Sequence, residues 1–292
     1  MFDVKRHSAT LLSLPFSFVI FAFFVVPLCL VIMVSFWDYN SYSIIPDFIF
    51  TNYQDIFYGC IKSLPDLCTS FATYISSLKF VFITWFITLI TGFLVALFLV
   101  FCVSSLQMQI VLFLLCTIPF WTSNVIRMIS WIPLLGRNGL VNSTMQNIGL
   151  TDSPAEWLLY SEFSVTLAFV HLYTLFMVVP IFNTMMRIDK SLIEAARDAG
   201  ANGVQILWNV IIPLTKPGIM IGTIFVVTLV MGDFITVRFM SGSQSANVGR
   251  LISNDIALLQ YPSASATAIV LLLTVLITIG ILLRFVDIRK EL

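Results

Sequence analysis

The sequence is poor in charged residues, which make up only 10% of its 292 residues. Soluble domains carry about 25% charged residues, so this chain cannot cover a water-facing surface. Its hydrophobic share is 59% and its mean hydropathy is +1.00. The net charge is zero, which gives no indication of a nucleic-acid partner. The composition therefore predicts a protein whose solvent is the lipid bilayer.

Signatures of nucleotide and metal binding are also lacking. No Gly-x-x-x-x-Gly-Lys-Ser/Thr segment occurs that could hold the phosphates of ATP. The two histidines, His7 and His171, have no other metal-ligating or catalytic residue near them in the sequence. We therefore expect a protein that is not an enzyme and that holds no metal or cofactor of its own.

Cysteine is scarce, and the five cysteines fall into two groups. Cys29, Cys102 and Cys116 lie in apolar stretches, where a thiol behaves as a small hydrophobic group. Cys60 and Cys68 lie together in a loop, and on an oxidising side of a membrane they could form a disulfide. Two unrelated free thiols are the alternative, because the sequence does not give the geometry of the pair.

Long apolar runs, in contrast, are abundant. A transmembrane helix needs roughly 20 apolar residues, and six stretches meet this length. They are residues 10–36, 75–103, 108–135, 164–186, 210–240 and 265–285. Proline and glycine within several of them predict kinks, which neighbouring helices tolerate in a membrane. The predicted fold class is an all-α integral membrane protein of six transmembrane helices in a single domain, residues 1–292.

The distribution of Lys and Arg predicts the orientation of these spans. With the N-terminus inside, the basic residues of the cytoplasmic side are Lys5, Arg6, Arg187, Lys190, Arg197, Lys216, Arg284, Arg289 and Lys290. The outer side then holds Lys62, Lys79, Arg137, Arg238 and Arg250. This bias predicts that both termini are cytoplasmic and that Cys60 and Cys68 lie outside. The outer loops carry Trp, Tyr and acids, which are either interfacial anchors or a docking rim for an external partner.

The predicted cytoplasmic loop between the fourth and fifth spans, residues 187–209, has the pattern of two short helices. Ser191 and Glu194 have the spacing of a capping box, and Gly200 stands where a left-handed residue ends a helix. Asn202 can cap a second helix, in which Leu207 and Trp208 share a face with Val204. A rigid element of this kind suits force transfer to a cytosolic partner, and a plain amphipathic surface helix is the alternative.

The segment from Glu194 to Gly200, followed by Pro213, resembles the EAA loop of ABC importer permeases, with Ile212 in place of the usual Leu. The resemblance implies the type I importer permease fold, in which this loop is the coupling helix that docks on an ATPase subunit. The residues that it assigns to coupling are Ser191, Glu194, Ala195, Ala196, Arg197, Asp198, Gly200, Leu207, Trp208 and Pro213.

The same resemblance implies a set of partners in the bacterial inner membrane. They are a second six-span permease, two copies of a cytosolic ATPase that hold ATP and Mg, and an extracytoplasmic solute-binding protein. Such a complex would carry a small molecule across the lipid bilayer by alternating access. A self-contained secondary transporter or channel is the alternative, although no internal repeat supports it.

Two further segments, Ile118–Arg127 and Leu134–Asn142, resemble the first permease of spermidine/putrescine-type importers, as do Gly232–Phe234 and Gly249–Arg250. This resemblance implies a small nitrogenous substrate, either a polyamine or an opine-like or amino-acid-derived compound.

Ionisable residues within spans mark functional sites because their burial in a bilayer is costly. Arg127 and Asp233 either pair with each other or with a partner chain, or they line the substrate path with Trp121, Asn124 and Tyr173. Asp233 and aromatic faces would attract a polycation, whereas an unpaired Arg127 would repel it and favour a substrate with a carboxylate or phosphonate.

Overall fold

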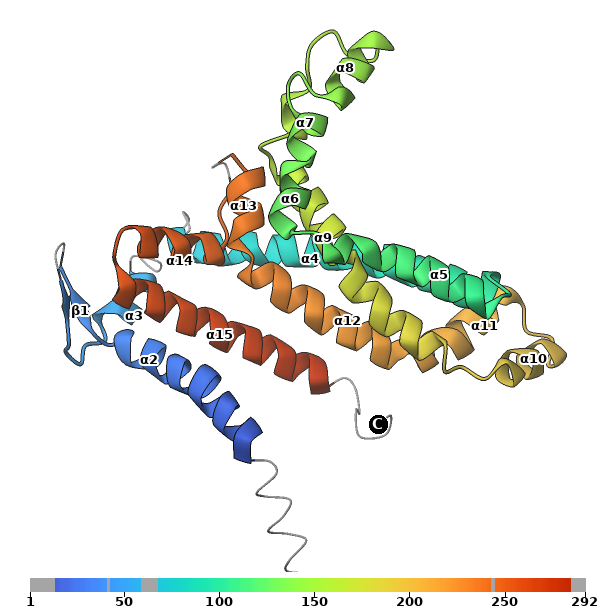
Figure 1. Cartoon of the computed structure of the whole chain (residues 1–292), viewed down its shortest axis with the longest axis horizontal. Helices are drawn as coiled ribbons and strands as arrows, with labels where there is room; N and C mark the ends of the chain where they lie inside the picture. The colour runs from blue at the N-terminus through green and yellow to red at the C-terminus, as the bar shows by residue number, and fades with distance from the viewer. Residues whose placement is uncertain (1–13, 41–42, 59–67, 243–244, 285–292) are drawn as a thin grey trace, which may run out of the picture. The chain divides into compact units, whose positions relative to one another are not determined.

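The computed structural model describes residues 14–40, 43–58, 68–242 and 245–284, which are mainly helical (Figure 1). Five helices are long and apolar enough to cross a membrane, and a bent pair of helices adds a sixth span if it is counted as one. The five are Leu14–Val34, Thr69–Cys102, Glu162–Met185, Gly203–Gly232 and Tyr261–Arg284, and the bent pair is Leu106–Trp121 with Asn124–Asn147. The predicted all-α membrane fold class is confirmed.

The chain forms two compact units, which are described separately. One contains the described residues of Met1–Phe71 and Leu251–Leu273, and the other those of Ala72–Arg250 and Thr274–Leu292. A single transmembrane domain over the whole chain stays a prediction. The cytoplasmic placement of the termini also stays a prediction.

The first unit contains the first span, a short two-stranded sheet and most of the last span. Its elements are η1 (Phe21–Val25), α2 (Val26–Val34), β1 (Asp38–Tyr39), β2 (Ile44–Ile45), α3 (Thr51–Ile56) and parts of α14 (Val248–Ala257) and α15 (Tyr261–Arg284). No residue of α2 is buried, as expected for a helix whose apolar surface faces lipid or another chain. The buried Asn52 amide donates to the carbonyl oxygens of Ser35 (3.0 Å) and Trp37 (2.8 Å), which fixes the chain after α2.

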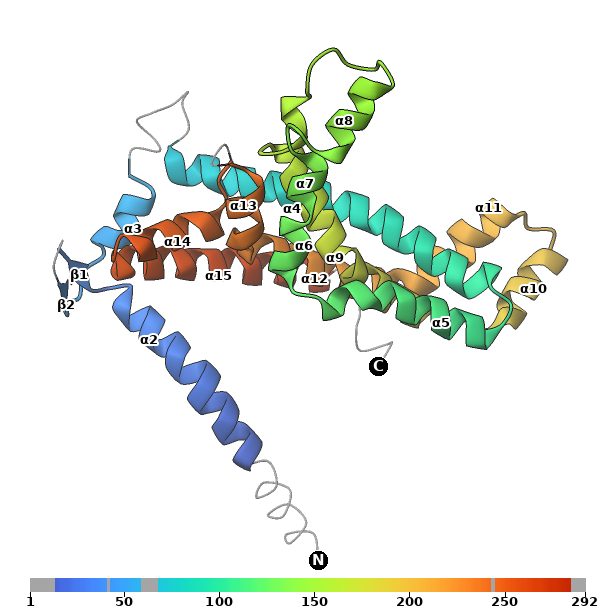
Figure 2. The same ribbon diagram turned by 45° about the horizontal axis from the view of Figure 1, so that its top comes forward.

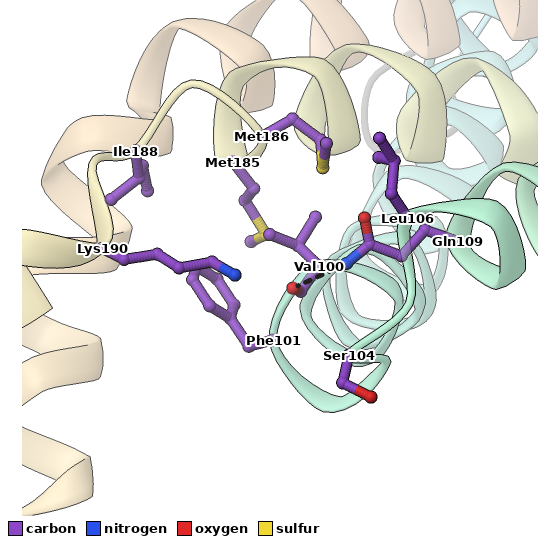
Figure 3. A pocket seen from close by; sticks show the side chains of 9 residues that line it. All are labelled: Val100, Phe101, Ser104, Leu106, Gln109, Met185, Met186, Ile188 and Lys190. Carbon is purple, nitrogen blue, oxygen red and sulfur yellow. Dashed lines mark hydrogen bonds between the residues drawn. The ribbon is translucent and has the colours of Figure 1, made fainter.

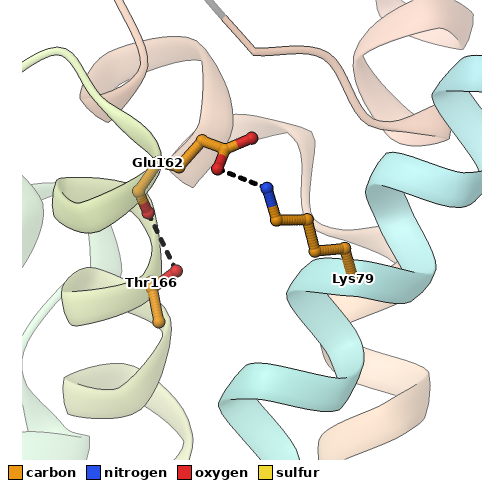
Figure 4. Close-up of polar contacts among 3 residues, drawn as sticks. All are labelled: Lys79, Glu162 and Thr166. Carbon is orange, nitrogen blue, oxygen red and sulfur yellow. Dashed lines mark hydrogen bonds and ion pairs between the residues drawn. The ribbon is translucent and has the colours of Figure 1, made fainter.

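The second unit contains nearly all of the second to fifth spans, the end of α15 and both candidate sites. Its elements are α4 (Thr69–Leu97), η2 (Phe98–Cys102), α5 (Leu106–Thr117), η3 (Ile118–Trp121), α6 (Asn124–Ile129), α7 (Trp131–Leu135), α8 (Leu140–Asn147), η4 (Glu156–Leu158), α9 (Glu162–Met185), α10 (Lys190–Asp198), α11 (Gly203–Ile206), η5 (Leu207–Ile211), α12 (Ile212–Gly232) and α13 (Phe234–Met240). In this unit the Lys79 amine pairs with the Glu162 carboxylate at 2.5 Å, which joins α4 to the start of α9 (Figure 4).

Helices α9 and α12 form the best-packed pair of this unit (Figure 2). Small residues make their close approach possible. A Cβ at Gly218 would lie 2.2 Å from the Thr184 hydroxyl oxygen and 2.5 Å from the Pro180 carbonyl oxygen. A Cβ at Gly222 would lie 2.6 Å from the sulfur of Met177. Membrane helices use small residues in this way because their association depends on close van der Waals packing.

The predicted third span, residues 108–135, is wrong as one helix. The segments Leu106–Trp121 and Asn124–Asn147 meet at an angle of 91°. The first ends in the 3₁₀ turn η3, and the backbone is extended at Thr122 (ψ 149°). The Thr122 N–H and hydroxyl both donate to the Pro119 carbonyl (3.2 and 2.8 Å), so the turn satisfies its own polar groups and can end here.

The predicted fifth span, residues 210–240, is likewise divided. A continuous helix runs from Gly203 to Gly232, and α13 begins at Phe234. The break lies at Asp233, whose backbone is extended (ψ 101°) and whose side chain caps α13 by accepting from the Thr236 N–H. A residue with a good N-cap side chain therefore starts a new helix within the apolar run.

Candidate functional site

The predicted coupling loop forms two short helices, α10 and α11, as the sequence indicated. The capping prediction for α10 is wrong by two residues. Asp189 is the N-cap, and its carboxylate accepts from the Ser191 N–H at 3.0 Å, whereas Ser191 lies inside the helix. This hydrogen bond lowers the pKa of the exposed Asp189 carboxyl. The group is therefore charged at neutral pH, which suits a helix N-terminus.

The end of α10 and the start of α11 are fixed by their own hydrogen bonds. Gly200 has a φ of +84°. The Gly200 N–H donates to the Arg197 carbonyl (2.8 Å) and the Ala201 N–H to the Ala196 carbonyl (3.0 Å), which is the Schellman pattern. Asn202 then caps α11 in a reciprocal pair with Gln205, with hydrogen bonds of 2.9 and 2.8 Å. The helix ends predicted at Gly200 and Asn202 are confirmed, and the two helices meet at a short, rigid corner.

Apolar side chains stand exposed on this corner. Val204 and Trp208 each expose 65% of their surface, and Leu192 exposes 48%. In contrast, Ile206 and Ile211 are buried against the spans. The predicted coupling residues Ser191, Glu194, Ala195, Arg197, Asp198 and Pro213 are exposed, and Ala196 and Leu207 are half-buried. The loop therefore offers an apolar patch with charged neighbours, as a protein interface requires.

The predicted substrate-path residues lie around the two helix breaks. The Asp233 carboxylate accepts three hydrogen bonds: from the Tyr173 hydroxyl (2.6 Å), the Thr236 N–H (3.0 Å) and the Thr236 hydroxyl (2.5 Å). The Asn247 amide donates to the Asp233 carbonyl at 2.7 Å. Because Tyr173 lies on α9, this cluster fixes the start of α13 to the neighbouring span.

Arg127 does not pair with Asp233 in the described part of the chain. Its guanidinium donates to the side-chain oxygen of Asn124, and its Nε is buried without a hydrogen-bond partner. Direct pairing is therefore not observed, while a partner chain or the substrate remains available to Arg127.

Aromatic rings surround this polar cluster. Tyr173 lies 6.2 Å from Phe176, which in turn lies 5.7 Å from Phe120 between ring centroids. Trp121, next to Phe120, is 83% exposed at the end of η3. The arrangement brings Arg127, Asn124, Tyr173 and Asp233 into one region, and its chemistry suits a small ligand with polar and cationic groups.

Sequence reasoning missed several residues that hold these sites. Thr236 and Asn247 complete the Asp233 cluster, and Asn142 organises the predicted outer loop. Asn142 is fully buried, donates to the Gly136 carbonyl (3.0 Å) and accepts from the Ala155 N–H (2.8 Å). The Leu134–Asn142 motif therefore has a structural use, which an Asn among apolar residues could have indicated.

Cys68 is disulfide-bonded, and its pairing with Cys60 stays a prediction because Cys60 lies outside the described residues. Among those described, Cys29, Cys102 and Cys116 are free thiols, and their apolar surroundings agree with the small hydrophobic role expected from the sequence.

Comparison with known proteins identifies a family. The profile described as "Binding-protein-dependent transport system inner membrane component" matches residues 81–290. The spermidine/putrescine transport system permease protein PotB of Escherichia coli is 31% identical over 214 residues, covering 73% of this chain and 75% of that protein. PotB of Haemophilus influenzae is 34% identical over 159 residues, covering 54% and 55% of the two chains.

A more distant relative is the putative 2-aminoethylphosphonate transport system permease protein PhnU of Salmonella typhimurium, 26% identical over 51% of each chain. Among solved structures, a chain of a bacterial ABC transporter that imports the acidic polysaccharide alginate matches with a TM-score of 0.77. It is 18% identical and covers 98% of both chains, which shows a common fold.

Proposed function

We propose that this chain, which belongs to the family of binding-protein-dependent transport system inner membrane components, is part of a multi-subunit importer of small nitrogenous solutes. As a member of that family, the chain is a multi-pass permease of an ABC importer in the bacterial inner membrane. Its proposed partners are a second six-span permease, two copies of a cytosolic ATPase that bind ATP and Mg, and an extracytoplasmic solute-binding protein.

The observation that carries this proposal is the corner formed by α10 and α11. Hydrogen bonds fix both helix ends, yet Leu192, Val204 and Trp208 remain exposed. An exposed apolar patch on a rigid element favours a protein partner. The coupling residues, Ser191 to Pro213, would there receive movement from the ATPase and pass it to α12, whose helix continues from α11. This continuity supports coupling by alternating access.

The substrate class is proposed from the relatives and the polar cluster together. PotB relatives favour a polyamine, and the 2-aminoethylphosphonate relative favours an amine that also carries an acid. Asp233 accepts three hydrogen bonds, whereas Arg127 has no acidic partner within the described residues. An amino-acid-derived substrate would therefore match this path better than a bare polycation. Competition for uptake between spermidine and an acidic amine tests this choice, and exclusive competition by spermidine would refute it.

A matched pair of glycines tests the coupling role. Gly200 needs its positive φ, whereas a Cβ at Gly203 meets nothing within 4 Å and that residue opens α11 with ordinary helical geometry. Gly200→Ala costs about 1–2 kcal/mol of left-handed strain at the corner, and Gly203→Ala removes a poor helix former. In the reconstituted complex, we expect Gly200→Ala to lower substrate-stimulated ATPase activity severalfold and Gly203→Ala to leave it unchanged. Equal ATPase activity of the two variants would refute the proposed coupling role of this corner.

A further inference from the structure

Two open pockets lie side by side where α10 faces the ends of the second and fourth spans. The first is lined by Phe101, Gln109, Met185, Met186 and Lys190, among others (Figure 3). The second is lined by Phe101, Ile193, Arg197, Ile206 and Ile211, among others. Phe101 belongs to both linings. These pockets are separate from the exposed Leu192, Val204 and Trp208 patch that is proposed to meet the ATPase.

Both pockets combine apolar walls with one cation. Lys190 and Arg197 are seven residues apart on α10, which puts them on one helix face about 10 Å apart along the axis. Ile193 lies between them on the same face. In Figure 3 the Lys190 side chain runs beside Phe101 into the first pocket. Lys190 and Arg197 therefore line pockets at the span ends and do not face the predicted cytosol alone.

No acidic residue lines either pocket. The acids of α10 itself, Glu194 and Asp198, are exposed and belong to neither lining, and Asp189 is occupied in capping the helix. Within the described residues no ion pair involves Lys190 or Arg197. Both cations are therefore available to an anion from outside the chain.

One lining residue of the first pocket, Gln109, is held in place by two hydrogen bonds. The buried Gln109 amide donates to the carbonyl oxygens of Val103 (2.7 Å) and Val100 (3.2 Å), which holds the turn between η2 and α5. Leu106 and Met186, which also line this pocket, expose 59% and 39% of their surfaces. An occupant therefore meets apolar side chains and the exposed positive charge of Lys190 together, and this combination matches a phospholipid at the membrane surface.

We propose that the face of α10 formed by Lys190, Ile193 and Arg197 binds the headgroups of acidic phospholipids at the inner membrane surface, so that lipid is a structural part of the coupling element. Basic pockets between membrane helices on the cytoplasmic side suit such headgroups by charge. Long cationic side chains at span ends also reach the headgroup layer while their stems stay in apolar surroundings. The proposed occupant is one lipid class, and none of the residues of the proposed ATPase-facing patch lines the site.

The test measures lipid retention by the full chain, purified from membranes and placed in nanodiscs. Native mass spectrometry compares phosphatidylglycerol with phosphatidylcholine for the wild type, Lys190→Gln, Arg197→Gln and the double variant. Each cation near an acidic lipid changes affinity by about fivefold. We expect retention of phosphatidylglycerol to fall about fivefold in each single variant and about 25-fold in the double variant. Lys190→Arg and Arg197→Lys, which keep the charge, should retain it.

Control variants are Arg187→Gln and Lys216→Gln, which remove exposed cations of the same predicted membrane side that line neither pocket. Equal loss in the controls would mean general attraction to a charged surface and would overturn the site. Unchanged retention in the double variant would overturn it too. Soluble glycerol phosphate or inorganic phosphate displacing the lipid would assign the site to a free anion instead. Because no ATPase or transport is measured, this outcome is independent of the importer assignment.

Discussion

Single residues decide how the two breaks in the membrane helices are held. Asp233 ends one helix and caps the next, and the Tyr173 hydroxyl reaches it from α9 at 2.6 Å. Each donor to a buried or half-buried carboxylate reduces the cost of keeping that charge away from water. The Tyr173 hydroxyl is therefore a link between spans as well as a part of the polar cluster.

Replacing that hydroxyl should weaken the unit. Hydrogen bonds to charged groups contribute about 1.5–3 kcal/mol, so Tyr173→Phe should lower the free energy of unfolding by about that amount. Tyr58→Phe is the control, because Tyr58 is 79% exposed. Thermal unfolding in detergent measures both. A Tyr173→Phe protein as stable as the control would show that the Tyr173 hydroxyl does not stabilise the break at Asp233.

Asn142 provides a second residue-scale prediction. Asn142→Ala leaves the part-buried Ala155 N–H without its partner and removes one of the two hydrogen bonds that the Gly136 carbonyl accepts, at a cost of about 1–3 kcal/mol for the unsatisfied N–H. The exposed Asn138→Ala is the matched control. We expect limited proteolysis to cut the predicted outer loop faster in Asn142→Ala only. Identical digestion of the two variants would contradict the proposed role of Asn142.

The sequence predicted which helices are capped, but not always which residue forms the cap. Gly200 and Asn202 were identified because each has a strong preference for one place in a helix. Ser191 was misplaced because Asp189 offers an equally good cap two residues earlier, and the spacing with Glu194 alone cannot choose between them. The partners of Asp233 could not be predicted, since Tyr173 lies 60 residues away and its direction depends on the packing of α9 and α13.

At the scale of helices, the contact between α9 and α12 depends on glycine. Gly218→Ala would drive a methyl group into the backbone carbonyl of Pro180, which cannot move as a side-chain end could. Overpacking of this kind typically costs about 1–3 kcal/mol or more. Gly280→Ala in α15 adds the same methyl group where nothing lies within 4 Å.

The expected result is a lower melting temperature and poorer yield for Gly218→Ala, with Gly280→Ala equal to the wild type or slightly more stable. Fluorescence-detected size exclusion after heating measures this difference. If Gly218→Ala has the same melting temperature as Gly280→Ala, the close approach of α9 and α12 is not required for stability.

Hydropathy predicted the spans because a span is recognised by the length and apolar composition of a segment, which hydropathy measures. It could not predict the 91° turn after Trp121 or the break at Asp233. Both sites sit within apolar runs, so hydropathy does not change there. The turn depends on Thr122 bonding back to Pro119, and the break depends on a capping carboxylate, and neither local bond alters an average over a window.

At the scale of the whole molecule, the distribution of basic residues makes a prediction about sidedness. Val204 and Ile148 are exposed to similar degrees, 65% and 67%, and they lie on predicted opposite sides of the membrane. In a background without reactive cysteines, Ile148→Cys should react with a membrane-impermeant maleimide in intact spheroplasts. Val204→Cys should react only after lysis. Labelling of Val204→Cys in intact spheroplasts would show that the predicted orientation is wrong.

The uninterrupted helix from Gly203 to Gly232 has a mechanical consequence. Its 30 residues span about 45 Å at 1.5 Å per residue, and its two ends are the α10–α11 corner and the break at Asp233. A rod of this length acts as a lever. If the proposed ATPase pushes the corner sideways at Gly203, we expect the far end of the helix to swing and to pull on the Asp233 anchor to Tyr173. We propose that the stiffness of this one helix transmits movement from the α10–α11 corner to the break at Asp233.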